Sequence, residues 1–246
     1  TRRSYPGKLM GLAGYGTVKE EMLPHLRQFF ITRDGKILDK IKNGTFYMGN
    51  GGKNLAATIQ KTLEDILFEE LDKYDTQIPL VVTGGCALNV IINEKIKDRY
   101  EREVYVPPNP HDGGLSLGHM FCYQKPKERV NVTYNGLPLL DRDKLKDYNT
   151  KKVTKKDIAK LIKDGNIIGM VYGDSEVGPR ALGNRSIICD PSIPEMKDIL
   201  NSKVKHRESY RPFAPFCKKE DAHKYFESRD FENMEYMSFA VKVKVD

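Results

Sequence analysis

Apolar side chains recur along this chain with different periods, and the changes of period separate helices from strands. Between residues 54 and 74, leucine and isoleucine follow one another every three or four positions, which is typical of a helix with one buried face. The segment IPLVVTGG at 78–85 is largely apolar and ends in two glycines. This pattern predicts a buried strand followed by a tight loop.

The same reasoning predicts that helices and strands alternate along most of the chain. In TKKDIAKLIKDG, Thr154 is placed to cap the start of a helix, and Gly165 is placed to end it. RDGK at 33–36 is typical of the turn of a β-hairpin. The order of elements predicts the α/β fold class, with ligands at the C-terminal ends of strands. Further helices are expected at 87–100, 111–124 and 193–208, and further strands at 102–110, 166–173 and 235–246.

A change of character at residues 125–150 indicates two domains. This segment is polar and contains two prolines and an Asn-Gly turn, so it is interpreted as a linker. The expected organisation is a first domain at 1–124, the linker at 125–150 and a second domain at 151–246.

Composition and charge restrict the class of protein. The chain has 246 residues, of which 39% are hydrophobic and 30% charged, as in globular domains. No apolar run approaches the roughly 18 residues of a membrane span, so no membrane partner is expected. The four cysteines are widely spaced and form no CxxC pair, which favours buried reduced thiols and a cytoplasmic location. The net charge of +7 suits a phosphate-bearing ligand or a weak attraction to nucleic acid.

Two short stretches contain most of the candidate chemistry. GPRALGNRS at 178–186 and NSKVKHRESYRPFAP at 201–215 combine cations with proline, glycine and other small residues. Arginine matches phosphate and carboxylate oxygens with two donors, and a rigid turn holds those donors in place. The two stretches therefore predict a polyanion site, although a solvated basic surface is the simpler alternative. Their cations are Arg180, Arg185, Lys203, Lys205, Arg207 and Arg211, with Asn184 and Ser186 beside them.

Two glycine-rich loops are weaker candidates. In TGGCALN, Gly84 and Gly85 would let backbone N–H groups approach an anion at a helix start, or would only make a tight turn. Asn89 could reach a ligand or cap the helix. Asp112 follows a strand rich in proline and suits a metal or a nucleotide, but one carboxylate does not make a metal site.

Taken together and in this order, five motifs resemble the O-carbamoyltransferase family of nodulation-factor and antibiotic carbamoyltransferases. The resemblance spans nearly the whole chain. The motifs are GKLMGLAGYG, TGGCALNVIIN, VPPNPHDGGLSLGH, GPRALGNRSIICDP and NSKVKHRESYRPFAP.

The resemblance implies a fold and an activity. The first domain would be the C-terminal part of a Kae1-like domain of the ASKHA type, and the second a YrdC-like domain, both incomplete. The second domain would form carbamoyl-adenylate from ATP and carbamoyl phosphate. The first would transfer the carbamoyl group to a hydroxyl of a small-molecule or saccharide acceptor. The resemblance leaves a homodimer open.

The resemblance also implies roles for individual residues. Asp112 matches the family's metal-binding aspartate, for iron, manganese, zinc or magnesium. The family's two histidine ligands, spaced HxxxH, are expected before Thr1, so this chain would hold the metal poorly. The phosphate-stabilising residues would be Arg180, Arg185, Lys205, Arg207 and Arg211, and the nucleotide-binding residues Gly84, Gly85, Asn89, Asn184 and Ser186.

The alternative is a nucleic-acid-associated protein related to the factors of tRNA threonylcarbamoylation. The net charge permits RNA contact. The basic residues are few and localised, however, and the motifs match the carbamoyltransferases more closely. Nucleic acid is therefore the less favoured partner.

Overall fold

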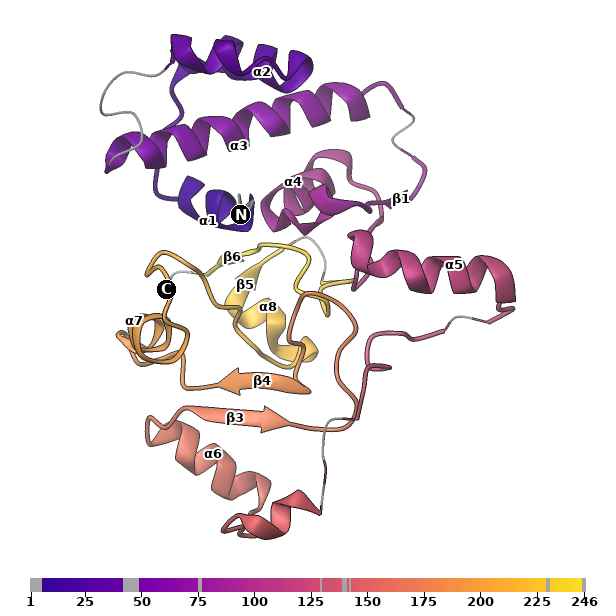
Figure 1. Cartoon of the computed structure of the whole chain (residues 1–246), viewed down its shortest axis with the longest axis vertical. Helices are drawn as coiled ribbons and strands as arrows, with labels where there is room; N and C mark the ends of the chain where they lie inside the picture. Colours follow the sequence, from indigo (N-terminus) through magenta and orange to yellow (C-terminus); the bar gives the residue numbers. More distant parts are fainter. Residues whose placement is uncertain are drawn as a thin grey trace. The chain divides into compact units, whose positions relative to one another are not determined.

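The computed structural model describes residues 6–41, 49–74, 77–128, 130–138, 141, 143–228 and 231–244. Its fold mixes helices with small two-stranded sheets, so the α/β prediction is confirmed at this coarse level (Figure 1). Contacts divide the chain into two compact units. Unit 1 comprises Thr1–Leu80, Lys95–Glu103 and Arg207–Phe213, and unit 2 comprises Val81–Glu94, Val104–His206 and Ala214–Asp246.

Most of the predicted elements are present, but the strands are short. The predicted helices at 54–74, 87–100 and 111–124 correspond to α3, α4 and α5, and the strand at 166–173 contains β3. The helices are α1 (Pro6–Ala13), α2 (Leu23–Thr32), α3 (Asn50–Leu71), α4 (Val90–Tyr100), α5 (Leu115–Gln124), α6 (Lys155–Lys163), α7 (Met196–Ile199) and α8 (Ala222–Tyr225). The strands are β1 (Leu80–Val81), β2 (Val104–Tyr105), β3 (Ile168–Val171), β4 (Arg185–Ile188), β5 (Phe226–Glu227) and β6 (Lys242–Val243).

Four of the predicted elements are much reduced. The strands expected at 78–85 and 102–110 are only β1 and β2, of two residues each. The helix expected at 193–208 is the single turn of α7, continued by a π-helical segment at Leu200–Val204. The strand expected at 235–246 is reduced to β6, and residues 245–246 lie outside the described residues. The alternating apolar residues before β6 are only partly buried, so alternation alone did not produce a strand.

The hairpin predicted around RDGK is wrong. Residues 23–32 form α2, and Arg33 ends the helix in the left-handed conformation with φ 60°. A 3-10 helix at Gly35–Lys40 follows, and Asp34 caps it by accepting from the Lys36 N–H. Burial explains the difference, because Leu26 and Ile41 are core residues of unit 1. Around them pack Met22, Leu38, Leu55 and Ile59.

In unit 2, β3 and β4 pair antiparallel and are joined by a long loop. Ile168 lies opposite Ile188, and Val171 lies opposite Arg185. The loop at 172–184 holds most of the GPRALGNRS motif. Most of the GPRALGNRS motif therefore lies in the loop of a hairpin, between two paired strands.

Part of the predicted linker is built into unit 2. The Val177 N–H donates to the Thr133 carbonyl at 2.8 Å, and the Gly136 N–H donates to the Ser175 carbonyl at 3.0 Å. Thr133 is 2% exposed. The segment at 133–137 thus runs along the loop between β3 and β4, because it supplies hydrogen-bond partners that the loop needs. The linker interpretation of 125–150 stays a prediction. The wider division at 1–124 and 151–246 stays a prediction.

Within the described ranges, none of the helices has the length and apolar character needed to cross a membrane.

The start of α6 is a capping box, as the sequence predicts. The Thr154 hydroxyl accepts from the Asp157 N–H, and the Asp157 carboxylate accepts from the Thr154 N–H. Gly165 follows the helix with φ 85°. Side chains on the helix's apolar stripe remain partly open, with Leu161 45% exposed. The capping hydrogen bonds therefore contribute to the stability of this helix beside its partly exposed apolar side chains.

We expect Thr154→Ala to lower the free energy of unfolding by about 1 kcal/mol, because the hydroxyl of an N-cap satisfies one otherwise unpaired N–H group. Urea unfolding followed by circular dichroism measures the change. Thr154→Ser keeps the hydroxyl and should lose less than half as much. Equal losses in the two variants would contradict the capping role.

Candidate functional site

Three motif loops that are distant in sequence meet in unit 2. The Gly84 N–H and the Thr83 hydroxyl both donate to the Pro110 carbonyl, at 2.7 and 3.0 Å. Gly178 comes so close to Pro108 that a Cβ there would lie 2.6 Å from the Pro108 carbonyl oxygen. The fold therefore brings TGGCALN, VPPNPHDGG and GPRALGNRS together, as the sequence alone could not show.

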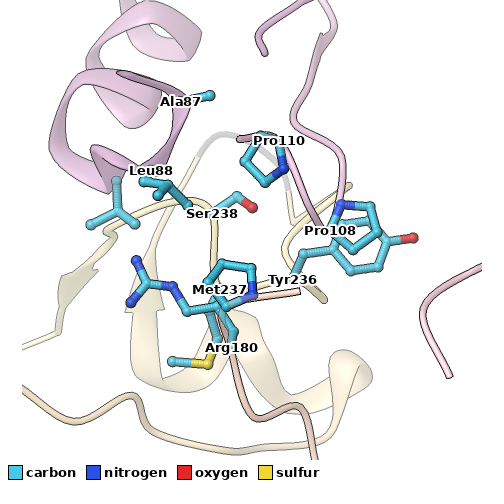
Figure 2. Close-up of a pocket in the computed structure, with 10 residues that line it drawn as sticks. Ala87, Leu88, Pro108, Pro110, Arg180, Tyr236, Met237 and Ser238 are labelled. Atoms are coloured by element: carbon cyan, nitrogen blue, oxygen red, sulfur yellow. The ribbon is translucent and has the colours of Figure 1, made fainter. Parts of the chain in front are cut away.

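A small pocket lies where these loops meet (Figure 2). Figure 2 shows the Arg180 side chain beside Met237, with Pro108 and Pro110 from the second motif facing the same space. The segment at 236–238 completes the wall, and no sequence signal marked it. Tyr236 and Ser238 of this segment bring hydroxyl groups to a mostly apolar lining. The full lining is Ala87, Leu88, Val90, Pro108, Pro110, Pro179, Arg180, Tyr236, Met237 and Ser238.

A buried amide holds one side of the pocket together. Asn93 is fully buried, and its Nδ2 donates to the carbonyls of Ala87 and Ser238, each at 2.8 Å. The Asn89 carboxamide accepts from the Ile92 N–H at 3.2 Å, as a helix cap does. Both asparagines therefore have structural partners.

Arg180 is the cation that this site leaves without a partner. Its side chain is half-buried, and within the described part of the chain it makes no hydrogen bond or ion pair. Burial lowers the pKa of the guanidinium, but an arginine stays charged near neutral pH. A charge withdrawn from water without a counter-ion costs free energy, which an incoming anion would recover.

Arg185, in contrast, is used within the fold. Its Nη1 donates to the carbonyls of Tyr172 and Asn184 at 2.9 and 2.8 Å, and its Nη2 donates to Gly173 at 3.1 Å. The side chain therefore ties the start of the loop to its end. The Asn184 carboxamide is also engaged, since its Nδ2 donates to the Asp174 carbonyl at 2.7 Å. In this structure neither residue presents those donors to a ligand.

Ser186 keeps a free donor. Its Oγ accepts from the Gly183 N–H at 3.0 Å. Because this bond uses a lone pair of the hydroxyl oxygen, the hydroxyl proton is left to donate elsewhere. The predicted role of Ser186 as a phosphate donor is compatible with this arrangement.

Glu176 is a functional candidate that the motif analysis missed. Its Oε1 accepts from the N–H groups of Leu182 and Asn184, each at 2.7 Å, and of Arg185 at 3.2 Å. Burial by itself would raise the pKa of Glu176, but the backbone donors outweigh it and lower the pKa below the usual glutamate range. The available signal was a carboxylate two residues before the Gly-Pro-Arg turn.

Comparison with known proteins gives this geometry a family. The model described as Carbamoyltransferase N-terminus matches residues 1–120, and the model described as Carbamoyltransferase C-terminus matches residues 159–246. The chain belongs to the carbamoyltransferase family. The loop between β3 and β4 lies within the C-terminal match, and the loops of Gly84 and Pro110 lie within the N-terminal match.

Curated relatives support the same assignment. The chain is 34% identical to the nodulation protein NolNO of Sinorhizobium fredii, over 96% of this chain and 40% of that protein. It is 36% identical to the nodulation protein NolO of Bradyrhizobium diazoefficiens, over 78% of this chain and 39% of that protein. An uncharacterized protein of Methanocaldococcus jannaschii is 32% identical over 99% of this chain and 46% of its own length. The chain thus spans less than half the length of these relatives.

The remaining cations expected from the family pattern are divided between the units. Lys205 lies in unit 2 and is exposed. Arg207 and Arg211 lie in unit 1, where the Arg207 guanidinium stacks on Phe213 at 4.5 Å and its Nη2 donates to the Pro212 carbonyl at 3.3 Å. Burial and the charge of Arg211 lower the pKa of Arg207. Their predicted contact with phosphate stays a prediction.

Among the described residues, Asp112 has no further metal ligands grouped around it. Asp112 is exposed at the start of a 3-10 turn, and the neighbouring His111 caps that turn by accepting from the Gly113 N–H at 3.0 Å. In the part of the chain that the structure describes, no three His, Cys, Asp or Glu side chains gather as ligands would. The metal role of Asp112 stays a prediction, because the two histidine ligands that the family resemblance implies are expected before Thr1.

The cysteines are free thiols, but none of the four is fully buried as expected. Cys86 is exposed in the turn after Gly84, and Cys122 is exposed on α5. Cys189 and Cys217 are half-buried. A neighbourhood of small residues did not predict burial, because short turns and surface helices also contain such residues.

Gly178 allows a test of how closely the motif loops must approach. Its φ is 136°, and an added Cβ would meet the Pro108 carbonyl. We expect Gly178→Ala to lower the free energy of unfolding by about 2–3 kcal/mol, from backbone strain together with the collision. Chemical unfolding measures this loss.

Gly183→Ala is the matched control. Gly183 also has a positive φ, 115°, but nothing lies within 4 Å of its added Cβ. This variant should show the cost of backbone conformation alone, about 1 kcal/mol. If the two variants were equally destabilised, the close approach to Pro108 would not matter.

Proposed function

We propose that this chain is the anion-binding part of an ATP-dependent O-carbamoyltransferase. The observation that supports this most directly is Arg180, a half-buried guanidinium in a pocket with no partner among the described residues. Its ligand would be the phosphate group of carbamoyl phosphate or of ATP.

The proposed reaction has three steps. Water converts carbamoyl phosphate to carbamate and inorganic phosphate. A carbamate oxygen then attacks the α-phosphorus of ATP, forming carbamoyl-adenylate and expelling pyrophosphate. An acceptor hydroxyl attacks the carbamoyl carbon, so that AMP leaves and the hydroxyl proton is released. The first two steps develop negative charge on phosphate oxygens.

A fixed cation suits those steps. Because Arg180 is partly withdrawn from water, its attraction for a phosphate is stronger than it would be on the surface. Because no internal carboxylate engages it, no ion pair has to break before the substrate binds. The Ser186 hydroxyl, which has a proton to donate, would be a second donor from the same loop.

The family relation supports two further assignments. The N-terminal family match would correspond to a Kae1-like transfer domain, and the C-terminal match to a YrdC-like domain that forms the adenylate. Gly84 and Gly85 are both exposed, and space is open around them, as a nucleotide-contacting turn requires.

We expect Arg180→Ala to abolish carbamoyl phosphate-dependent exchange of pyrophosphate into ATP, with a loss of at least about a hundredfold. The assay uses the longest natural polypeptide that contains this chain, since the relatives are more than twice as long. The same change should weaken binding of inorganic phosphate to the 246-residue chain, measured by calorimetry. Its stability should fall little, because the guanidinium makes no hydrogen bond or ion pair among the described residues.

Two variants act as controls. Arg180→Lys keeps the charge but not the two-pronged donor geometry, and should retain part of the exchange. Lys160→Ala removes one charge from the exposed surface of α6 and should leave exchange unchanged. Unchanged exchange in Arg180→Ala would disprove the assignment of the loop.

A further inference from the structure

At its C-terminal end, the loop between β3 and β4 finds acceptors for its backbone donors within the same hairpin. The N–H groups of Leu182, Asn184 and Arg185 all point at one oxygen of Glu176, and the Gly183 N–H donates to Ser186. Four consecutive amides therefore have acceptors inside the loop. A turn of this kind would otherwise be an anion-binding nest. Here the anion in the nest is a side chain of the protein.

This arrangement closes a ring in the chain. The carboxylate of Glu176 joins residue 176 to residues 182–185, and the segment at 177–181 projects from the junction. Arg180 lies on that projecting segment. Its place in the pocket is therefore set by the bonds of Glu176 and by the close packing of Gly178 on Pro108.

The same bonds keep Glu176 away from Arg180. A glutamate four residues before an arginine is a natural ion-pair partner in a helix. In this loop the backbone is not helical, and the described residues show no ion pair between the two side chains. An oxygen that accepts three N–H groups has little capacity left for a guanidinium. The charge of the carboxylate is thus stabilised by three amides, and the described residues show no ion pair between it and Arg180.

We propose that Glu176 is a positioning residue for the anion site, which holds the loop so that Arg180 meets the phosphate of the substrate unpaired. This inference rests on the proposed function of Arg180 and adds the residue that prepares it. Glu176 itself does not touch the substrate. Removal of its carboxylate leaves three amides without an acceptor and frees the ring that carries Arg180.

The test measures binding of inorganic phosphate and of carbamoyl phosphate to the 246-residue chain by calorimetry. Glu176→Ala should weaken both by about tenfold or more, equivalent to at least about 1.4 kcal/mol. Glu176→Gln keeps an acceptor oxygen without the charge, and should lose clearly less. Because the glutamine variant keeps the shape of the side chain, it also guards against a failure of the alanine variant to fold.

A second measurement separates positioning from general destabilisation. Formate can enter the vacated nest of Glu176→Ala and accept from the same three amides. It should partly restore phosphate binding in that variant, relative to its effect on the wild-type chain. In NMR spectra, the amide signals of Leu182, Asn184 and Arg185 should shift in the alanine variant and return toward their original positions with formate.

Thr154→Ala is the matched structural control, since it removes a side-chain bond to a backbone amide in the same unit. It should leave phosphate affinity within a factor of about two, because affinity depends on the loop and not on stability alone. An equal loss of affinity in this control would overturn the proposal. Unchanged affinity in Glu176→Ala would also overturn it, and higher affinity would show that Glu176 competes with the ligand.

The results distinguish this inference from the proposed function. If Arg180→Ala abolishes binding but Glu176→Ala does not, the anion site stands and the positioning role fails. If both variants weaken phosphate binding but no pyrophosphate exchange occurs in the longer protein, the positioning role stands and the carbamoyltransferase mechanism fails. If the wild-type chain binds neither anion, both proposals fail.

Discussion

The need to give every buried backbone donor an acceptor shapes the loop between β3 and β4. A turn rich in glycine and proline cannot pair its N–H groups as a strand or a helix does. In this protein one carboxylate oxygen of Glu176 meets three of them, and the Ser186 hydroxyl meets a fourth. The loop's carbonyl groups also need donors, and Arg185 donates to carbonyls at both ends of the loop. Among the described residues the Arg180 guanidinium has no hydrogen bond or ion pair, and it lines the pocket.

The two arginines of one motif therefore have different tasks. They are five residues apart and look equivalent in the sequence. Arg185 begins β4, where its guanidinium meets the carbonyls of the turn, while Arg180 projects into a pocket lined by prolines. A motif of two arginines can thus contain one residue that builds the loop and one that the loop presents. The distinction matters for the chemistry, because only a donor without an internal partner is free to stabilise a substrate's charge.

Several helices could be predicted from the spacing of residues in the sequence, because the interactions that form them join residues close together in the chain. The capping box of α6 satisfies its own N–H groups within four residues, and α3 repeats its apolar positions over six turns. RDGK failed for the opposite reason. Its turn residues are compatible with a hairpin or with a helix end, and the burial of Leu26 and Ile41 in one core decided between them. Residues 133–137 are mostly polar, and their sequence gives no signal for the hydrogen bonds that they form with the loop between β3 and β4.

The sequence by itself determined the family, the main helices, the strand that contains β3 and the presence of an arginine-rich turn. Each of these is encoded by residue types close together in the chain. Only the tertiary structure showed that the motifs of Gly84, Pro110 and Arg180 converge, and that the segment at 236–238 joins them. It also showed which polar groups already have partners. Whether a side chain is free or engaged depends on carbonyls and amides brought from distant segments, and a residue's own identity does not reveal them.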